Sequence, residues 1–458
     1  MIDIQRKLLI AGLLLQLTAS AGLAQSTDAA LITKGKGIHD RVLKLDTHDD
    51  IDPANFTADC NYTQRLTTQV NLPKMVEGDM DVAFFVVYVG QGLPTPEAYD
   101  HAYEQAIEKF DAIHRFTEKI APDVIGLALT PEDVRRIHKQ GKRVAVIAIE
   151  NGYPIGHDIK RVKEFYDRGG RYMSLAHNGA SQLADSNTGE ATGFTHGNGL
   201  SPLGRQVIAE MNRLGMMIDL SHPSKGANLE AILLSKAPVI ASHSSVRALA
   251  DHSRNMDDGQ LLALKQNGGV IQIVGFASYL KVDSKERTAA LSKLRDDFGF
   301  GGGGRAGAGG GFLRRQEGPR ACPVEDPNAA KAAPGAAGGR RTSMFLNMLP
   351  ADRREEFQKR MAEIDAQFPP APRANVQDMV NHIDYAVKLI GIDHVGISSD
   401  FDGGGGIDGW DSAADAFNVT LELVRRGYTE EQIGKLWSGN LLRVWSDVEK
   451  VAKQLQKK

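Results

Sequence analysis

The chain has 458 residues, of which 42% are hydrophobic and 24% are charged, which is ordinary usage for a globular protein. Its 54 lysines and arginines stand against 57 aspartates and glutamates, giving a formal net charge of −3. A chain so close to neutrality has no overall basic field to hold nucleic acid or an anionic membrane, so we expect neither as a partner.

The first 24 residues have the pattern of a signal peptide. Arg6 and Lys7 precede the apolar run Leu8–Leu17, and small residues then lead to Ala24. The alternatives are an uncleaved anchor and a buried helix, but a membrane span needs about 20 apolar residues and this run is shorter. We therefore expect residues 1–24 to be removed, residues 25–458 to form one domain without a membrane span, and the mature protein to be secreted to the periplasm.

Eight strand-like runs alternate with helical patterns along the rest of the chain. They are Val42–Leu45, Val82–Val89, Val144–Ile149, Arg171–Leu175, Met216–Leu220, Pro238–Ala241, Val270–Val274 and His394–Ser398. Amphipathic stretches such as Tyr99–Ile120, Pro202–Leu214 and Val376–Ile390 lie between them. This alternation indicates βαβ units and a parallel sheet. Eight repeats favour closure into a (β/α)8 TIM barrel, the α/β fold class that we predict.

Residues 281–372, before the eighth strand, are too many for an ordinary barrel connection. Gly299–Gly311 is almost pure glycine and Ala329–Arg341 is rich in alanine, glycine and proline, which is typical of disorder. The flanks Lys285–Asp297 and Pro350–Phe368 have the pattern of charged helices. We expect a partly disordered surface insertion.

The insertion can enter at either end of the barrel. It enters at the mouth if it follows the seventh strand directly, and at the opposite end if it follows the seventh helix. The first alternative is favoured because Gly275–Tyr279 runs straight into it. Of the two cysteines, Cys322 lies within the insertion and Cys60 far before it. Export would permit a disulfide, but we expect no structural role for this pair.

Six of the apolar runs stop at a histidine or a carboxylate. The residues are His48 and Asp50, Glu150, His177, His222, His243, and Asp400. In a (β/α)8 barrel the catalytic groups lie at the carboxyl ends of the strands, so these side chains are expected to meet in one polar site.

Each of these residues alone is weak evidence. His48 and Asp50 are two positions apart, so their side chains project to the same side of a strand and can grip one ion, although a hydrogen-bonded histidine in a turn has the same spacing. Glu150 is either a helix N-cap or a metal bridge. His222 and His243 end successive strands, which lie about 5 Å apart in a sheet. The imidazoles of His222 and His243 could therefore bind the same metal ion.

Together, His222, His243, Glu150 and the pair His48 and Asp50 make five ligands, more than the three protein groups of one catalytic zinc. They suit two ions about 3.5–4 Å apart with the glutamate between them. The mixture of imidazole and carboxylate favours zinc, or a similar divalent ion, over calcium or magnesium. His177 and Asp400 remain as non-ligands suited to polarising a substrate and transferring protons.

The order of motifs resembles the membrane (renal) dipeptidase family of metallopeptidases, which belongs to the amidohydrolase-like barrels. The resemblance runs from about Val42 to Trp445, excluding the insertion. It is carried by DTHDD, AIENG, RYMSLAHNGASQLADS, GLSPLGRQVIAEMNRLGMMIDLSH, PVIASHSSVRALADHSRNMDD and HVGISSDFDG. The resemblance implies a zinc dipeptidase in which His48 and Asp50 hold one ion, His222 and His243 hold the other, and Glu150 bridges them.

The resemblance also implies roles for three further residues. His177 would contact the scissile carbonyl, Arg254 would bind the substrate carboxylate, and Asp400 would be the acid and base. Glu150 is counted as catalytic as well as a ligand, because the nucleophile would be a hydroxide bridging the two ions. The preferred substrates would be dipeptides with a free C-terminus. On residue patterns alone, Arg254 could equally be a surface salt bridge.

Two positions depart from the family pattern. Asp49 stands where the family usually has asparagine, and Asp52 stands where proline is common. We expect extra negative charge near the pocket. The alternatives to a dipeptidase are another metal-dependent barrel hydrolase acting on cyclic amides, lactones or β-lactams, and an inactive peptide-binding homologue. A homodimer is one alternative for the assembly.

Overall fold

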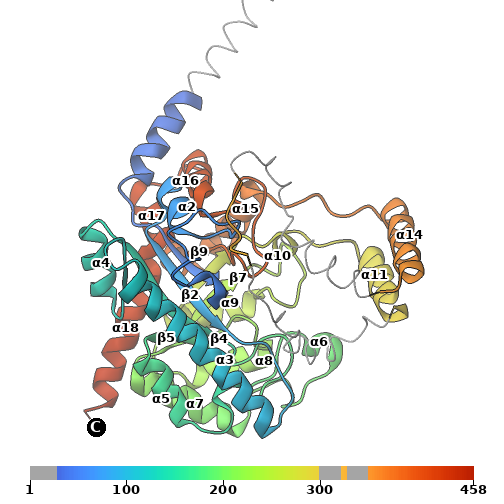
Figure 1. Cartoon of the computed structure of the whole chain (residues 1–458), viewed down its shortest axis with the longest axis horizontal. Helices are drawn as coiled ribbons and strands as arrows, with labels where there is room; N and C mark the ends of the chain where they lie inside the picture. Colours follow the sequence, from blue (N-terminus) through green and yellow to red (C-terminus); the bar gives the residue numbers. More distant parts are fainter. Residues whose placement is uncertain (1–27, 299–320, 327–348, 458) are drawn as a thin grey trace, which may run out of the picture.

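The structure is a computed structural model that describes residues 28–298, 321–326 and 349–457. Its centre is a nearly closed parallel barrel whose strands follow the order β1-β2-β4-β5-β6-β7-β8-β9 (Figure 1). The strands are β1 Leu45–Asp50, β2 Val82–Tyr88, β3 Ile125–Leu127, β4 Arg143–Glu150, β5 Gly170–Ser174, β6 Met217–Asp219, β7 Ile240–Ser244, β8 Val270–Val274 and β9 Val395–Ser398. The predicted (β/α)8 fold is confirmed. The short strand β3 pairs with β4 outside this path and was not predicted.

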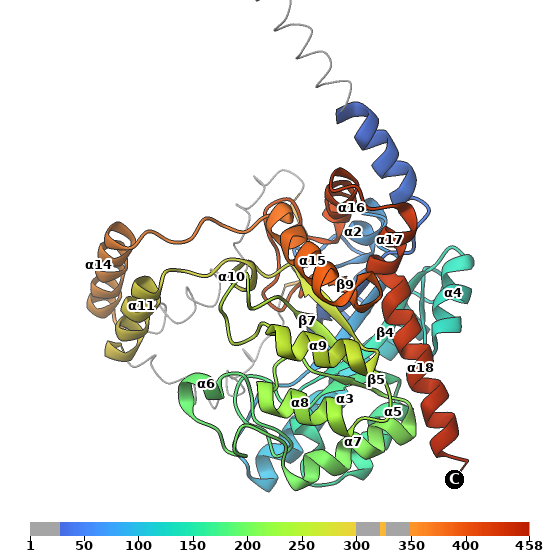
Figure 2. The same ribbon diagram turned by 180° about the vertical axis from the view of Figure 1, so that it is seen from behind.

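Helices surround the strands (Figures 1 and 2). They are residues 28–39, α2 Leu72–Glu77, α3 Pro96–Arg115, α4 Pro131–Lys139, α5 Lys160–Asp167, α6 Gly189–Thr192, α7 Pro202–Leu214, α8 Lys225–Leu234, α9 Asp258–Asn267, α10 Ala277–Leu280, α11 Lys285–Asp297, α14 Ala351–Gln367, α15 Val376–Ile390, α16 Ala416–Arg425, α17 Glu430–Gly434 and α18 Asn440–Leu455. None of the described helices is long and apolar enough to cross a membrane.

Alternation along the strands divides the core into two layers. Along β2, Val82, Phe84 and Val86 belong to the inner cluster, which also contains Tyr172 and the α18 residue Trp445. The intervening residues of β2 pack outward in the larger cluster that lies beneath the helices. Successive side chains of a strand point to opposite faces, so each strand serves both layers.

The first strand begins and ends later than its apolar run indicates. Only Leu45 of the predicted Val42–Leu45 lies in β1, and the strand continues through His48 to Asp50. Its polar residues are held by the loop that follows β9, because the Ser399 N–H donates to Asp46 at 3.0 Å and the Asp50 N–H donates to the Phe401 carbonyl at 2.9 Å. These two bonds bring the first and last strands together at the mouth of the barrel.

The insertion leaves the barrel at its mouth, as favoured from the sequence. It follows β8 through α10, and its flanking helices α11 and α14 match the two charged helices that were predicted. They pack on each other beside the barrel through Leu294, Phe298 and Phe357 (Figures 1 and 2). The glycine-rich Gly299–Gly311 and the alanine-rich Ala329–Arg341 lie outside the described residues, so their predicted disorder stays a prediction. The predicted signal peptide also lies outside them.

The expectation that Cys60 and Cys322 have no structural role was wrong. They form a disulfide across 262 positions of sequence. The segment 321–326 is further held to the barrel side, because the Thr67 N–H donates to the Pro323 carbonyl at 2.7 Å and Glu325 forms ion pairs with Arg65 and Lys74. The glycine-rich and alanine-rich sequence around Cys322 gives no information about the disulfide or about the contacts of residues 321–326.

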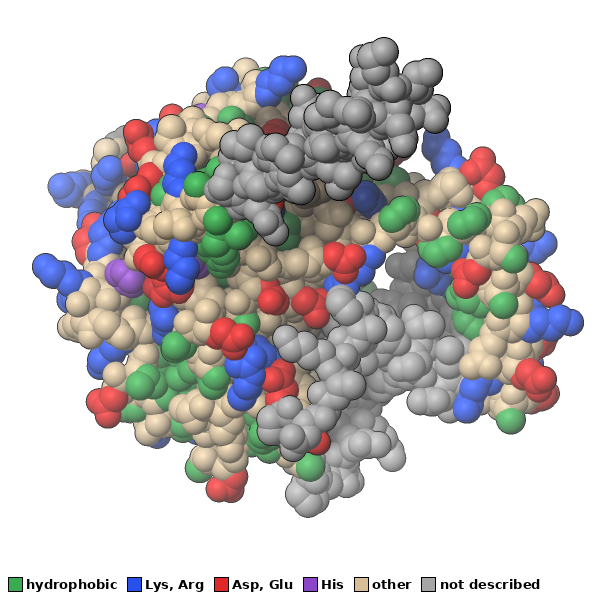
Figure 3. Space-filling model, turned by 90° about the horizontal axis from the view of Figure 1, so that it is seen from above, with side chains coloured by type: hydrophobic (Ala, Val, Ile, Leu, Met, Phe, Trp, Pro, Cys, Tyr) green, Lys and Arg blue, Asp and Glu red, His purple; other side chains and the backbone are tan. Residues whose placement is uncertain are grey.

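Charged side chains of both signs are intermixed on the face that Figure 3 shows from above. This mixing agrees with the formal net charge of −3.

Candidate active site at the barrel mouth

The strand ends bring the predicted site residues to one place. His48 and Asp50 belong to β1, Glu150 ends β4, His243 belongs to β7, and His177, His222 and Asp400 follow β5, β6 and β9. Glu150 continues the inward series of Val144, Val146 and Ala148 along β4, which explains why its carboxylate enters the barrel. The predicted alternative of a helix N-cap does not apply, because Glu150 lies in the strand.

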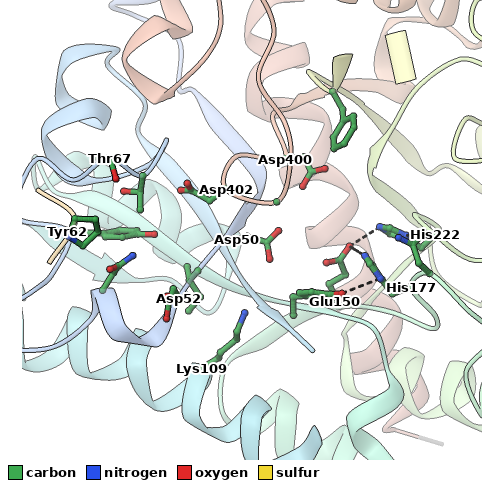
Figure 4. A pocket seen from close by; sticks show the side chains of 18 of the residues that line it. Asp50, Asp52, Tyr62, Thr67, Lys109, Glu150, His177, His222, Asp400 and Asp402 are labelled. Atoms are coloured by element: carbon green, nitrogen blue, oxygen red, sulfur yellow. Dashed lines mark hydrogen bonds and ion pairs between the residues drawn. The ribbon is translucent and has the colours of Figure 1, made fainter. Parts of the chain in front are cut away.

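Glu150 is the centre of the cluster, and its two oxygens face different partners. Oε1 lies 2.9 Å from Nε2 of His222 and 3.3 Å from Nε2 of His243. Oε2 lies 3.6 Å from Nε2 of His48, which is itself 3.8 Å from an oxygen of Asp50. His177 is close as well, with its Nε2 at 3.8 Å from Oε1. Figure 4 shows Glu150 with His177 and His222 beside it, and with Asp50 and Asp400 nearby.

The outer hydrogen bonds of the histidines determine which ring nitrogen carries the proton. The Tyr172 hydroxyl donates to the Thr47 carbonyl at 2.9 Å, so it accepts from Nδ1 of His48 at 2.8 Å. In the same way the Ser242 hydroxyl donates to Asp219 at 2.7 Å and accepts from Nδ1 of His243 at 2.8 Å. In the neutral tautomer, each Nε2 then presents a lone pair to Glu150.

The same arrangement holds for His222, whose Nδ1 lies 3.3 Å from the Asn178 side-chain oxygen, an acceptor. Three lone pairs thus converge on a carboxylate, and Nε2 of His222 and Nε2 of His243 are only 3.1 Å apart. Lone pairs of hydrogen-bond acceptors that face one another with no proton between them repel electrostatically. A cation bound between them removes this repulsion. The described residues include three sets of this kind: His48, Glu150 and His243; Glu150, His177 and His222; and His48, Asp50 and Asp400. The donor set fits divalent metal ions.

Burial and charge shift the pKa values of His222, His243 and Glu150 in the directions that metal binding requires, and the pKa of His48 in the opposite direction. Burial, assisted by the positive charge of Arg254, lowers the pKa of His222 and His243 well below the usual value, so both rings are neutral. Burial opposes a charge on His48 too, but Glu150 and other carboxylates raise its pKa to about 9. A proton and a metal ion therefore compete for that ring. Burial alone would raise the pKa of Glu150, yet the surrounding imidazoles lower it well below its usual range.

Asp400 differs from the other carboxylates of the cluster. Burial raises its pKa well above the usual value, and the negative charges of Asp50 and Glu150 act in the same direction. A carboxyl group with a raised pKa holds its proton more readily than a normal carboxyl group does. The raised pKa therefore suits the proton-transfer role that was predicted for Asp400, a role that stays a prediction.

Backbone conformations that few side chains adopt occur at this site. His222 has φ 81° and Asp400 has φ 60°, both in the left-handed region. Such residues persist where the surrounding structure holds them, and they concentrate at functional sites. Gly403 is needed beside them, because a Cβ at this position would overlap the carboxylates of both Asp400 and Asp50.

The cluster forms one end of a cavity of about 380 Å³. Tyr62 and Thr67 lie at the opposite end (Figure 4). Asn55, Thr68 and Pro323 of the insertion also line the cavity, and the Thr67 N–H donates to the Pro323 carbonyl. The disulfide and the contacts of segment 321–326 hold this end in place. The cavity therefore combines a rigid polar wall with the carboxylates and imidazoles of the barrel.

Arg254 lies beside the site but not in the wall of this cavity. It is buried, and its guanidinium donates to the His243 carbonyl at 3.0 Å and to the Ser244 hydroxyl at 3.4 Å. Its Nε is buried without a hydrogen-bond partner among the described residues. The alternative of a surface salt bridge was wrong, because Arg254 is 5% exposed. Its role towards a substrate stays a prediction.

Tyr88 and Lys109 are among the cavity residues that the sequence analysis did not identify. Tyr88 ends β2 opposite Glu150 in the register of the sheet, and its hydroxyl lies 3.3 Å from Nδ1 of His177. A polar group ending an apolar run was the same signal that identified the other residues, so Tyr88 could have been found. Lys109 lies on α3, where an isolated lysine carries no comparable signal.

The unusual residue Asp49 is buried in β1 and points away from the cluster. Both of its oxygens lack a hydrogen-bond partner among the residues that the structure describes. Burial, followed by the negative charges of Asp46 and Asp402, raises the pKa of Asp49 well above its usual value. The folded state therefore favours the protonated carboxyl.

Replacing Asp49 with asparagine should stabilise the metal-free protein at neutral pH. Because the folded pKa is raised, the stability associated with Asp49 is complete below the unfolded pKa of about 4 and is lost as pH rises through the folded value. The neutral amide has no such loss, so the free energy of unfolding should rise by about 1–3 kcal/mol at pH 7 and the gain should fade towards pH 4. Denaturant unfolding between pH 4 and 8 measures this, with the exposed Asp123→Asn as control. A destabilised D49N protein at pH 7 would contradict the reasoning.

The chain is similar to known dipeptidases. The family model described as membrane dipeptidase (peptidase family M19) matches residues 33–458. Dipeptidase tcpJ of Claviceps purpurea is 28% identical over 395 residues, which cover 85% of this chain and 72% of the relative. Dipeptidase aclJ of Aspergillus oryzae is 28% identical over 407 residues, which cover 88% of this chain and 74% of the relative.

Solved structures of similar proteins share the fold. The probable dipeptidase PvdM from Pseudomonas aeruginosa is 32% identical and superposes with a TM-score of 0.72, over 92% of this chain and 99% of that one. A metallo peptidase from Rhodobacter sphaeroides, liganded with a phosphinate mimic of the dipeptide L-Ala-D-Ala, is 20% identical with a TM-score of 0.62 over 89% and 99% of the two chains, a likeness of fold. The family match over nearly the whole chain shows that the protein belongs to the membrane dipeptidase family, peptidase family M19, whose members are metal-dependent dipeptidases.

Proposed function

We propose that this metallo-dipeptidase hydrolyses dipeptides at a centre of two zinc ions bridged by Glu150. The observation that carries the proposal is the division of the Glu150 carboxylate, with Oε2 towards His48 and Oε1 towards His222 and His243. Asp50 completes the set on the side of His48. One carboxylate that faces two groups of ligands is the arrangement expected of a metal bridge.

The metal ions, when bound, would lower the pKa of water to about 7 and polarise the scissile carbonyl. Residues of the protein would transfer the protons and bind the carbonyl oxygen of the substrate. Asp400, with its raised pKa, would accept a proton from the attacking water and pass it to the leaving amine. His177, which is steadied by Tyr88, would donate to the carbonyl oxygen of the substrate. His177 is also near enough to Glu150 to be an alternative ligand.

Replacing Asp400 with Asn should keep two equivalents of zinc per chain and lower kcat about 10²–10⁴-fold, because proton transfer is lost while the ligands remain. Metal analysis of the purified protein and dipeptide hydrolysis measure the two effects. The exposed Asp408→Asn in the same loop is the matched control and should keep full activity. If the Asp400 variant also loses metal, Asp400 is a ligand, and if the unmodified protein binds fewer than two ions, the binuclear proposal is wrong.

We further propose that Arg254 binds the C-terminal carboxylate of the substrate. Its buried Nε without a hydrogen-bond partner among the described residues supports this role, and a guanidinium is well suited to a carboxylate. Its position outside the cavity wall favours the second candidate function, a barrel hydrolase acting on cyclic amides, lactones or β-lactams, which would not need this residue.

Replacing Arg254 with Ala should lower kcat/KM for Leu-Ala about 10–100-fold, since a hydrogen-bonded charge is lost. The same substitution should hardly change kcat/KM for the C-terminal amide of Leu-Ala, because this substrate has no carboxylate for Arg254 to bind. Steady-state kinetics on this substrate pair measure the difference, with Arg213→Ala on the exposed face of α7 as control. Equal losses on both substrates would contradict the proposed contact, and activity on cyclic amides alone would favour the second candidate.

We also propose that the protein is exported to the periplasm as a mature chain. The Cys60–Cys322 disulfide supports this, because such bonds persist in oxidising compartments. Mass spectrometry of the protein from its native cells should find an N-terminus at Gln25 and the two cysteines joined. An intact N-terminus together with two free thiols would contradict export.

A further inference from the structure

The cavity contains one feature that the proposed chemistry does not use, the ammonium group of Lys109. This side chain reaches from α3 into the cavity wall, on the side of Asp50 and Asp52 and away from His222 (Figure 4). It is the only lysine or arginine among the described residues that line the cavity. Lys109 is half-buried, so its charge is partly removed from water.

Among the described residues, the neighbours of Lys109 do not accept hydrogen bonds from its ammonium group. Its Nζ lies 5.7 Å from the ring centroid of Tyr88, at the distance of a cation–π contact. No described residue accepts a hydrogen bond from Nζ or forms an ion pair with it. A lysine ammonium has three donors, and leaving them unpaired in a cavity wall costs free energy unless water or a ligand accepts them.

The neighbouring carboxylates have other tasks. Asp52 caps the short helix Pro53–Asn55, with one oxygen accepting from the Ala54 N–H at 3.0 Å. Asp50 faces His48, on the side of the proposed metal centre. Lys109 is therefore not simply the partner of an adjacent acid, although Asp50, Asp52 and Glu150 counteract the lowering of its pKa by burial and so help to keep it charged.

The position of Lys109 decides which part of a substrate can reach it. The ring of Tyr88, which Lys109 overlies, packs against His177 with centroids 4.6 Å apart, so the ammonium borders the reacting centre. Arg254 donates to the His243 carbonyl and lines a second, small cavity together with His222, the residue from which Lys109 points away in Figure 4. A dipeptide whose C-terminus turns towards Arg254 would direct its amino-terminal residue towards Lys109 and the polar end of the cavity.

We propose that Lys109 is a specificity-determining residue that binds a carboxylate on the side chain of the substrate's amino-terminal residue. The inference rests on the proposed dipeptidase function and deepens it, since it names acidic dipeptides such as Glu-Ala and Asp-Ala as a preferred substrate class. Asn55, Thr67 and Thr68 line the same cavity, and their polar groups suit such a side chain better than an apolar one.

The test compares substrates that differ in charge and hardly in shape. The zinc-loaded full-length mature protein should hydrolyse Glu-Ala with a kcat/KM about ten-fold or more above that for Gln-Ala, and Asp-Ala should likewise exceed Asn-Ala, because a charge-assisted hydrogen bond is lost with the amide. Lys109→Met, which keeps the volume and removes the charge, should bring both ratios to about one. Lys109→Arg should keep a preference for the acidic substrates.

The matched control is Lys119→Met, an exposed lysine just beyond α3, which should keep the ratios of the unmodified protein. Equal kcat/KM for acidic and amide substrates in the unmodified protein, or an unchanged preference in Lys109→Met, would overturn the inference while leaving dipeptidase activity intact. Absence of hydrolysis of all four dipeptides and of Leu-Ala would instead contradict the proposed function. The measured quantity is the ratio of kcat/KM for the acidic dipeptide to kcat/KM for its amide counterpart in the same protein. A variant that is partly unfolded loses activity on both substrates equally, so its ratio does not change.

Discussion

The site depends on keeping the charge of Glu150 inside the barrel. A buried carboxylate is costly unless opposite charge and hydrogen bonds compensate it. Here the compensation comes from imidazoles of four strand ends, and the outer partners Tyr172, Ser242 and Asn178 orient three of them. The barrel thus fixes both the position and the tautomer of its histidines, and a cation completes the charge balance. The geometry of the whole mouth follows from this requirement.

Much of the fold could be predicted because buried parallel strands have a simple pattern. Apolar runs such as those of β4 and β8 are continuous, so their ends identify the mouth of the barrel and the residues that meet there. The pattern fails where a strand is polar. β1 carries Asp46, His48 and Asp50 because its partners at the mouth are side chains and backbone groups of the loop after β9, and hydropathy does not record such partners. The three-residue strand β3 was too short to give a periodic signal.

Other features depend on contacts between distant parts of the chain. The cysteine pair spans 262 positions, and the composition of its surroundings pointed away from an ordered role. Lys109 is one lysine among several on exposed helices, and only the three-dimensional structure shows that it enters the cavity. Arg254 was identified by resemblance to a family, but its position behind His243 could not be deduced from the sequence. Side-chain direction is the information that a linear pattern lacks.

The anchoring of segment 321–326 has a consequence for how this protein can vary. The disulfide and the ion pairs of Glu325 fix residues 321–326, in the middle of the insertion, to the barrel, so the insertion is tied to the barrel at this point as well as at its two ends. The entropic cost of closing a loop grows only slowly with its length. Residues can therefore be gained or lost on either side of this anchor during evolution with little penalty to the barrel, while the peptide that borders the substrate cavity stays where it is.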